Sequence, residues 1–267
     1  MSPQGNGDGR PVGADFLSLP ERTAKPRRSG VTHVLDAGLG VAELESLLEQ
    51  AGAFIDVVKF GWGTAYVSPT IAKKVQACRR AGVHACLGGT LLEIVEAQGQ
   101  MERFVSWIRA LGVDCVEVSN GALGMSPERK RTLVAELCDE FLVLSEVGSK
   151  QPVIPVAGEW IDELTDDLAA GATWAITEGR ESGSVGLFDA SGEVRTGLLE
   201  EILAQVGRER VIFEAPRRQQ QACLILRAGA DVNLGNVATD QVISLETLRL
   251  GLRADTVAIS GGLRSSC

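Results

Sequence analysis

The sequence lacks a hydrophobic segment long enough to cross a membrane. None of its uninterrupted apolar runs approaches the ~20 residues that a membrane-spanning helix needs. The N-terminal residues are rich in Gly, Pro and Arg, and they lack the apolar core of a secretory signal. We therefore expect a cytoplasmic protein without a membrane partner.

Basic residues are also in short supply. Lys and Arg together number 26 against 35 Asp and Glu, which gives a formal net charge of −9. Proteins that bind a phosphate backbone favour a basic surface, so this balance argues against a nucleic-acid partner. The sequence contains no P-loop, dinucleotide fingerprint or Ser/His/Asp arrangement. Basic residues gathered around a pocket would therefore be more noteworthy here than in a basic protein.

Cysteine pairs at metal-finger or redox spacing are missing too. The six cysteines stand at positions 78, 86, 115, 138, 223 and 267, and most fall inside apolar runs. This distribution favours small buried hydrophobic residues in a reducing compartment. The two histidines, His33 and His84, fall within predicted strands, where we expect them to pack in the core or line the barrel.

The length of the chain suits one large domain. A closed α/β barrel commonly needs about 250 residues. Residues 1–29 carry Gly, Pro, Ser and charge without periodicity, which predicts a flexible N-terminal tail. Residues 30–256 form the predicted domain, and the small, polar residues 257–267 form a C-terminal tail. The basic side chains of the first tail are expected to be solvated: Arg22, Lys25, Arg27 and Arg28.

Within the predicted domain, short apolar runs alternate with longer amphipathic segments. Continuous Val, Ile and Leu runs predict strands that are buried on both faces, near residues 31–36, 54–60, 82–87, 113–118, 140–146, 172–178, 210–215 and 230–235. Apolar stripes of helical period predict helices near residues 41–51, 69–81, 98–111, 127–139, 160–170, 196–206, 217–228 and 244–253. Eight such alternations predict a single (β/α)8 TIM barrel, with a doubly wound open sheet as the alternative.

Two predicted strand ends carry groups suited to an anion. Lys59 ends an apolar run, and Gly61 and Gly63 after it would let the backbone approach a ligand closely. A lysine in this place could instead extend to solvent or pair with a carboxylate. The turn Gly88-Gly89-Thr90 offers free amides and a hydroxyl at a helix entrance, although an ordinary turn has the same composition.

Three acidic residues, Glu146, Glu178 and Glu214, end the fifth, sixth and seventh predicted strands. A carboxylate at the end of a buried strand must be paired, protonated or bound to a cation. Such oxygen ligands suit Mg²⁺. The alternative is pairing with one of the nearby basic residues Lys59, Lys150, Arg180 and Arg218.

Basic and amide side chains follow other strand ends. Lys150 comes shortly after the fifth strand, and a lysine near a metal-held carbanion can give or take its proton. Arg180 and Arg218 could grip phosphate or sulfonate oxygens through paired donors. Asn233 and Asn236 lie at the eighth strand, where barrels often hold phosphate.

These segments resemble the phosphosulfolactate synthase family over most of residues 31–256. The resemblance rests on six long motifs: Lys59-Phe60-Gly61-Trp62-Gly63-Thr64, Gly88-Gly89-Thr90-Leu91, Glu146-Val147-Gly148, Glu178-Gly179-Arg180-Glu181-Ser182-Gly183 with Gly186-Leu187-Phe188-Asp189, Val211-Ile212-Phe213-Glu214-Ala215-Pro216, and Val242-Ile243-Ser244-Leu245-Glu246-Thr247-Leu248-Arg249. It implies a (β/α)8 barrel that adds sulfite to phosphoenolpyruvate with the help of Mg²⁺.

The resemblance also implies roles for individual residues. It assigns catalysis to Lys150, Lys59 and Arg180, with Lys150 as the donor of a proton to C2. It assigns Mg²⁺ to Glu146, Glu178 and Glu214. It assigns the phosphate of the small anionic substrate to Arg218, Asn236 and the Gly235 backbone, and the sequence adds Thr64, Gly89, Thr90, Asn120 and Asn233 as candidate substrate-binding residues. We further expect a homo-oligomer.

Several departures from the family pattern lie inside these motifs. Ala37 stands where the archaeal synthases carry lysine, and Asn120-Gly121-Ala122 stands for their Asp-Gly-Ser. Ser149 replaces the first of two lysines, and Leu87 replaces a proline. One alternative is therefore a diverged member that acts on another phosphorylated or polar substrate. A second is a non-catalytic stress or interaction protein, but an abandoned pocket would gain nothing from buried charge.

Overall fold

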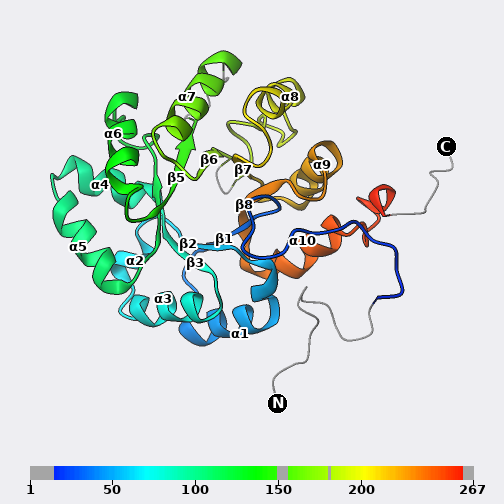
Figure 1. The fold of residues 1–267 in the computed structure, drawn as a ribbon, viewed down its shortest axis with the longest axis horizontal. Coiled ribbons are helices and arrows are strands. Elements are labelled where there is room, and N and C mark those ends of the chain that lie inside the picture. Colours follow the sequence, from blue (N-terminus) through cyan, green and yellow to red (C-terminus); the bar gives the residue numbers. More distant parts are fainter. Residues whose placement is uncertain (1–14, 149–155, 180–181, 261–267) are drawn as a thin grey trace.

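A computed structural model of the chain describes residues 15–148, 156–179 and 182–260. Eight parallel strands close into a barrel in chain order, so the predicted TIM barrel is confirmed and the open sheet is wrong. Figure 1 shows the helices arranged around the barrel. The strands are β1 (Thr32–Asp36), β2 (Val57–Phe60), β3 (His84–Leu87), β4 (Cys115–Val118), β5 (Leu142–Val147), β6 (Trp174–Thr177), β7 (Val211–Glu214) and β8 (Asn233–Ala238).

The helices match the predicted segments except at two places. The α-helices are α1 (Val41–Ala51), α2 (Thr64–Val67), α3 (Ile71–Arg80), α4 (Gly89–Ala97), α5 (Met101–Leu111), α6 (Pro127–Leu137), α7 (Ala157–Ala169), α8 (Thr196–Gln205), α9 (Arg218–Ala228) and α10 (Val242–Arg249). Sequence analysis missed α2 and α4. Helix α4 begins at Gly89, in the Gly88-Gly89-Thr90 turn that was expected to stand at a helix entrance, although no helical segment was predicted directly after it.

The barrel interior changes character along its axis. One cluster of buried residues is apolar and contains Val57, Cys86 and Ile212. Lys59 lies beside Cys86 in the register of β2 and β3, two residues after Val57. Because side chains alternate along a strand, Lys59 points to the same interior face as Val57, but nearer the carboxyl end. The interior therefore runs from apolar to charged toward the carboxyl ends of the strands.

The segment before β1 packs against the amino end of the barrel. Arg22 forms ion pairs with Asp231 and Glu246, and Arg27 lies 3.2 Å from Asp56. The side chains of Arg22 and Arg27 are only 7% and 6% exposed. The prediction that they are solvated is therefore wrong, because their partners lie far away in the sequence and meet them only in the folded barrel.

The two histidines have different surroundings. His33 is fully buried, as predicted. His84 stands at the amino end of β3, and its side chain is 42% exposed beside Asp114, so the prediction of a core position is wrong for this residue.

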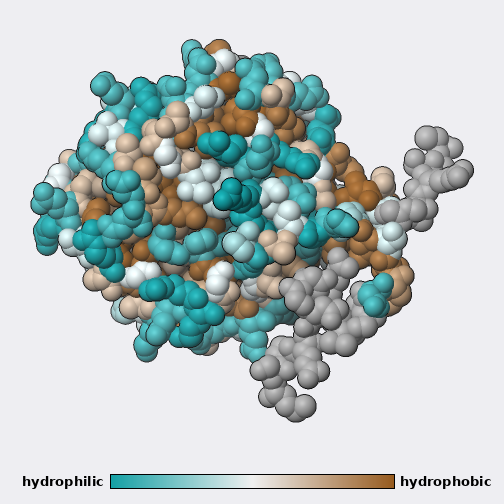
Figure 2. All heavy atoms as spheres, in the orientation of Figure 1, coloured by the Kyte–Doolittle hydropathy of each residue, from teal (hydrophilic) through white to brown (hydrophobic). Residues whose placement is uncertain are grey.

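The visible face of the molecule is largely polar, and its described helices are short. Figure 2 shows hydrophilic residues over much of the visible face, with smaller hydrophobic areas between them. Among the described residues, every helix is too short or too polar to span a membrane.

Candidate active site

A cavity of about 430 Å³ lies at the carboxyl ends of the strands, the end at which TIM barrels carry their active sites. Its charged lining consists of Lys59, Glu117, Glu146, Glu178 and Glu214. The remaining lining residues are small, polar or apolar: Leu35, Gly61, Trp62, Gly88, Gly89, Thr90, Ser182 and Asn236. The chain thus gathers five buried charged groups from five different strands or strand ends at one place.

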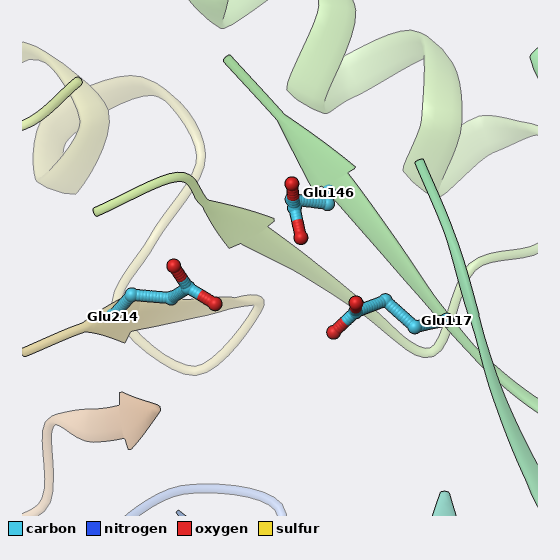
Figure 3. Close-up of side chains that lie close together, drawn as sticks. All are labelled: Glu117, Glu146 and Glu214. Atoms are coloured by element: carbon cyan, nitrogen blue, oxygen red, sulfur yellow. The ribbon is translucent and has the colours of Figure 1, made fainter. Parts of the chain in front are cut away.

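Three carboxylates converge on the centre of this cavity. Glu117, Glu146 and Glu214 each place an oxygen within 4.8 Å of the other two. Figure 3 shows these side chains pointing toward one another from β4, β5 and β7. Lys59 joins them from β2, with its Nζ 2.9 Å from Glu117 Oε2 and 3.2 Å from Glu214 Oε1. The predicted acids Glu146 and Glu214 and the predicted cation Lys59 therefore share one site.

Glu117 was missed by sequence analysis. It interrupts the apolar strand Cys115–Val118 just as Lys59 interrupts Val57–Phe60. Its signal was a single acid within a buried run, rather than an acid followed by a glycine-rich loop. A charged residue inside a continuous buried strand is costly enough to be a candidate in its own right.

Burial and neighbouring charges set the protonation of the cluster. Burial opposes the charged form of Lys59, but attraction to Glu117 and Glu214 outweighs it and raises the lysine pKa well above its usual value. Burial also opposes the charge on Glu117, yet Lys59 lowers the pKa of this carboxyl overall. Lys59 and Glu117 therefore form a charged pair.

The pKa values of Glu146 and Glu214 are raised, whereas that of Glu117 is lowered. Burial, followed by repulsion from Glu178, raises the pKa of Glu146 well above its usual range. Burial raises the pKa of Glu214 to about 7, although Lys59 opposes the change. Without a bound cation, these carboxyls favour protonation, because one lysine cannot balance all of the acids.

The donor set fits a hard divalent cation. Among the described residues that line the cavity there are four carboxylates and one lysine, an excess of three negative charges (4 − 1) when all are ionised. Burying such an excess is costly unless a cation compensates it. All the acidic donors are oxygens, the ligands that Mg²⁺ and Ca²⁺ prefer, and the group of three that could hold an ion contains neither His nor Cys.

Glycine turns hold two of these acids in place. The Gly89 amide donates to Glu117 Oε1 at 2.8 Å, and the Gly179 amide donates to Glu214 Oε2 at 2.9 Å. A Cβ on Gly89 would come within 2.5 Å of Ser119 Oγ, so a larger residue would displace the turn. The Gly89 amide, predicted to bind substrate, therefore positions a carboxylate, while Gly89 and Thr90 still line the cavity.

Buried charges on the helices support the strand ends from outside. Glu93 of α4 accepts hydrogen bonds from Ser119 Oγ and from the Leu123 amide, just beyond β4. Lys130 of α6 is fully buried and donates to the backbone oxygen of Glu146 at 2.6 Å. These contacts fix the strand ends that present Glu117 and Glu146.

Asn236 lies near the carboxyl end of β8, the strand that pairs with β7. Its backbone amide donates to His33 Nδ1 at 3.3 Å, and the residue lines the cavity. Burial, followed by the charge of Lys59, lowers the pKa of His33 to about 3, so this histidine stays neutral and able to accept. Gly235 lies in the interior just below, where a Cβ would come within 2.9 Å of Ile212 Cγ2.

Four other residues that sequence analysis predicted for the site lie outside the cavity lining. Asn233 lies at the amino end of the barrel, where its Oδ1 accepts from the Val31 amide at 2.9 Å. Arg218 is exposed at the start of α9, Asn120 is half-buried beyond β4, and Thr64 begins α2 outside the cavity lining. Lys150 and Arg180 lie outside the described residues.

A second hollow of about 500 Å³ adjoins the central cavity. The two share Leu35 and Asn236 in their linings. Its other lining residues are Ala37, Gly38, Leu39, Glu43, Pro216, Ala238 and Thr239. Of these described residues Glu43 alone is charged, so this hollow contrasts with the central cavity.

Comparison with known proteins places the chain in one family. The family model for (2R)-phospho-3-sulfolactate synthase (ComA) matches residues 20–255. The phosphosulfolactate synthase of Bacillus subtilis is 39% identical over 247 residues, covering 91% of this chain and 98% of its own. That of Methanothermobacter thermautotrophicus is 40% identical over 250 residues, covering 91% and 96%.

Solved structures support the fold alone. A 3-hexulose-6-phosphate synthase aligns with a TM-score of 0.52 and 12% identity, covering 82% of this chain and 98% of its own. The sequence relatives are much closer, and they span nearly the full length of both partners. The chain belongs to the phosphosulfolactate synthase family of enzymes.

Proposed function

We propose that this enzyme adds sulfite to phosphoenolpyruvate with the help of Mg²⁺, to give phosphosulfolactate. The observation that carries the proposal is the convergence of Lys59 with Glu117, Glu146 and Glu214 in a member of this family. The relatives at 39% and 40% identity bear the name of that activity. The substrates and the metal are the part of the proposal that experiment must test.

The reaction builds up negative charge at a known place. Sulfite forms a bond from sulfur to C3, the π electrons of the C2–C3 double bond move toward C2 and the carboxylate, and C2 then takes up a proton. Every reactant is anionic, so an acidic cluster alone would repel them. Mg²⁺ in the cavity would supply the charge that draws the carboxylate in and stabilises the enolate.

The described residues have separable tasks in this scheme. Glu146 and Glu214, with Glu178 beside them, would hold the metal. Lys59 keeps its proton because its pKa is raised, so it would act as a fixed positive charge that faces the developing enolate. Glu117 holds Lys59 in place.

Contacts with the substrate's other anionic group would come from the cavity rim. Thr90, in the first turn of α4, and Asn236, in β8, both line the cavity. A hydroxyl and a side-chain amide can donate hydrogen bonds to phosphate oxygens. The sequence predicts Lys150 as the proton donor to C2, and that residue lies outside the described residues.

The proposal is tested by incubating the full chain with Mg²⁺, phosphoenolpyruvate and sulfite, and by following product formation with mass spectrometry. We expect a product equal in mass to phosphoenolpyruvate plus sulfurous acid, lost on chelation and restored by Mg²⁺. Lys59→Met serves as the inactive control. A wild-type enzyme that binds phosphoenolpyruvate but forms no sulfite adduct would contradict the proposed nucleophile.

A second candidate function is addition of a larger, less charged nucleophile to the same acceptor. It is favoured by the hollow beside Ala37, which adjoins the central cavity at Leu35 and Asn236. Ala37→Lys would narrow this hollow and give it a positive charge. If sulfite is the nucleophile, this variant should raise sulfite addition; if turnover with sulfite does not change, the departure at Ala37 does not separate this chain from its relatives.

A further inference from the structure

Trp62 has an unusual backbone conformation. Among the described residues, two that are not glycine have a left-handed backbone, Trp62 and Asn236, each with φ of 51°. Both line the central cavity. Asparagine adopts this conformation with little penalty, whereas a bulky residue rarely does. Strained residues of this kind persist where the surrounding structure enforces them, often at binding sites.

The surroundings of Trp62 enforce its conformation from both sides. The Gly61 amide donates to the Asp36 oxygen at 3.0 Å, and the Gly88 amide donates to the Phe60 oxygen at 3.2 Å. A Cβ on Gly61 would come within 2.7 Å of Leu35 Cδ1, and one on Gly88 within 2.9 Å of the Trp62 nitrogen. The loop after β2 is thus pressed between β1 and the turn after β3 and cannot relax without moving them.

Core packing does not explain a tryptophan at this position. Trp62 is 43% exposed, so a large part of the residue gains nothing from burial in the free protein. Glycine would adopt the same backbone without strain, and both neighbours, Gly61 and Gly63, are glycines already. The side chain therefore adds a cost to the free protein that the fold itself does not need.

We infer that the indole ring of Trp62 is a wall against which the bound substrate packs. The inference rests on the proposed function. Phosphoenolpyruvate has a planar, unsaturated carbon skeleton between two anionic groups, and an aromatic face complements such a plane. The other described residues lining the cavity are mostly charged, polar or small, and Trp62 is the aromatic residue among them. A covering ring would also exclude water from the charged cluster and strengthen its interactions.

Calorimetry with phosphoenolpyruvate and Mg²⁺ tests the wall, using the wild type and Trp62→Ala, Trp62→Gly and Trp62→Phe. Both variants without a ring should lose at least about tenfold in affinity, whereas Trp62→Phe should stay within about threefold. Tyr66→Ala is the matched control, since Tyr66 is 75% exposed on α2 and does not line the cavity. Wild-type affinity in Trp62→Ala would overturn the inference.

Thermal melting tests the strain separately. Trp62→Ala keeps a side chain in the left-handed conformation and Trp62→Gly does not, so the glycine variant should melt about 2–4 °C higher. Equal melting temperatures would overturn the strain argument. A wild type that binds no phosphoenolpyruvate would instead contradict the proposed function, and the inference with it.

Discussion

The two ends of the barrel both bury charge, but they treat it differently. At the amino end, two buried arginines have partners within the chain: Arg22 pairs with Asp231 and Glu246, and Arg249 donates to the backbone oxygens of Ala230 and Val232. At the carboxyl end, one lysine faces four carboxylates among the described lining residues. The arginines at the amino end have partners in the protein itself, whereas the acids at the carboxyl end outnumber the one lysine and need a proton or a cation.

This contrast separates stability from function. A substitution at the amino end should change the free energy of unfolding and leave turnover intact. A substitution at the carboxyl end should change turnover, and its effect on stability should depend on whether it removes the lysine or one of the acids. TIM barrels in general carry stability at the amino face and catalysis at the carboxyl face.

The largest effect is expected for Lys59→Met. It leaves Glu117 and Glu214 buried without their shared cation, which should cost about 3–5 kcal/mol of unfolding free energy as well as turnover. Chemical denaturation and steady-state assays measure the two losses. A variant as stable as the wild type would show that the acids, and not the pair with Lys59, determine the charge of the site.

Glu146→Gln should separate the stability of the fold from turnover. It removes a carboxyl whose charge is opposed by burial and by Glu178, so the fold should be as stable as the wild type or more so. Turnover should fall by about 10²–10³, since a proposed metal ligand is lost. A marked fall in melting temperature with normal turnover would reverse the assignment of this end of the barrel.

Arg249→Leu makes the opposite test at the amino end. The guanidinium is buried, and its loss leaves the oxygens of Val31, Ala230 and Val232 without this donor. We expect a loss of about 2–4 kcal/mol in unfolding free energy. At a temperature where the variant is folded, kcat/KM should match the wild type. A selective loss of turnover in the folded variant would break the comparison.

The smallest effect is expected at His84. Its hydrogen bond to Asp114, at 2.7 Å, raises the pKa of the imidazole in the folded protein. The resulting stabilisation is complete below the unfolded pKa of about 6.5 and disappears as pH rises through the higher folded pKa. The melting temperatures of wild type and His84→Ala should therefore differ more at about pH 5.5 than at about pH 9. A difference that is constant with pH would remove the ion pair as its cause.

Sequence patterns predicted the barrel because most of its strands are largely apolar and its helices have clear periodic stripes. The same patterns predicted the first and last residues of a strand less accurately. The eighth strand was predicted at 230–235 but runs from Asn233 to Ala238. The strand thus begins three residues later than predicted. Asn233 therefore lies at the amino end of the barrel instead of at the expected substrate site, whereas Asn236 lines the cavity.

Charge partners were harder still to predict. Glu117 carries no flanking glycine, so its part in the cluster depends on the closure of the barrel, which brings β4 beside β5 and across from β7. Arg22 pairs with acids 209 and 224 residues away. Local periodicity does not indicate which residues that are far apart in the sequence will meet, and only the folded chain brings these groups together.

The central claim is that the carboxyl end of the barrel binds a divalent cation in order to balance its excess acid. Titration of the substrate-free protein with Mg²⁺ by calorimetry tests it most directly, with Glu146→Gln as the comparison. We predict binding of one ion per chain to the wild type and at least about tenfold weaker binding to the variant. No binding to the wild type, or equal affinity in both proteins, would contradict the account.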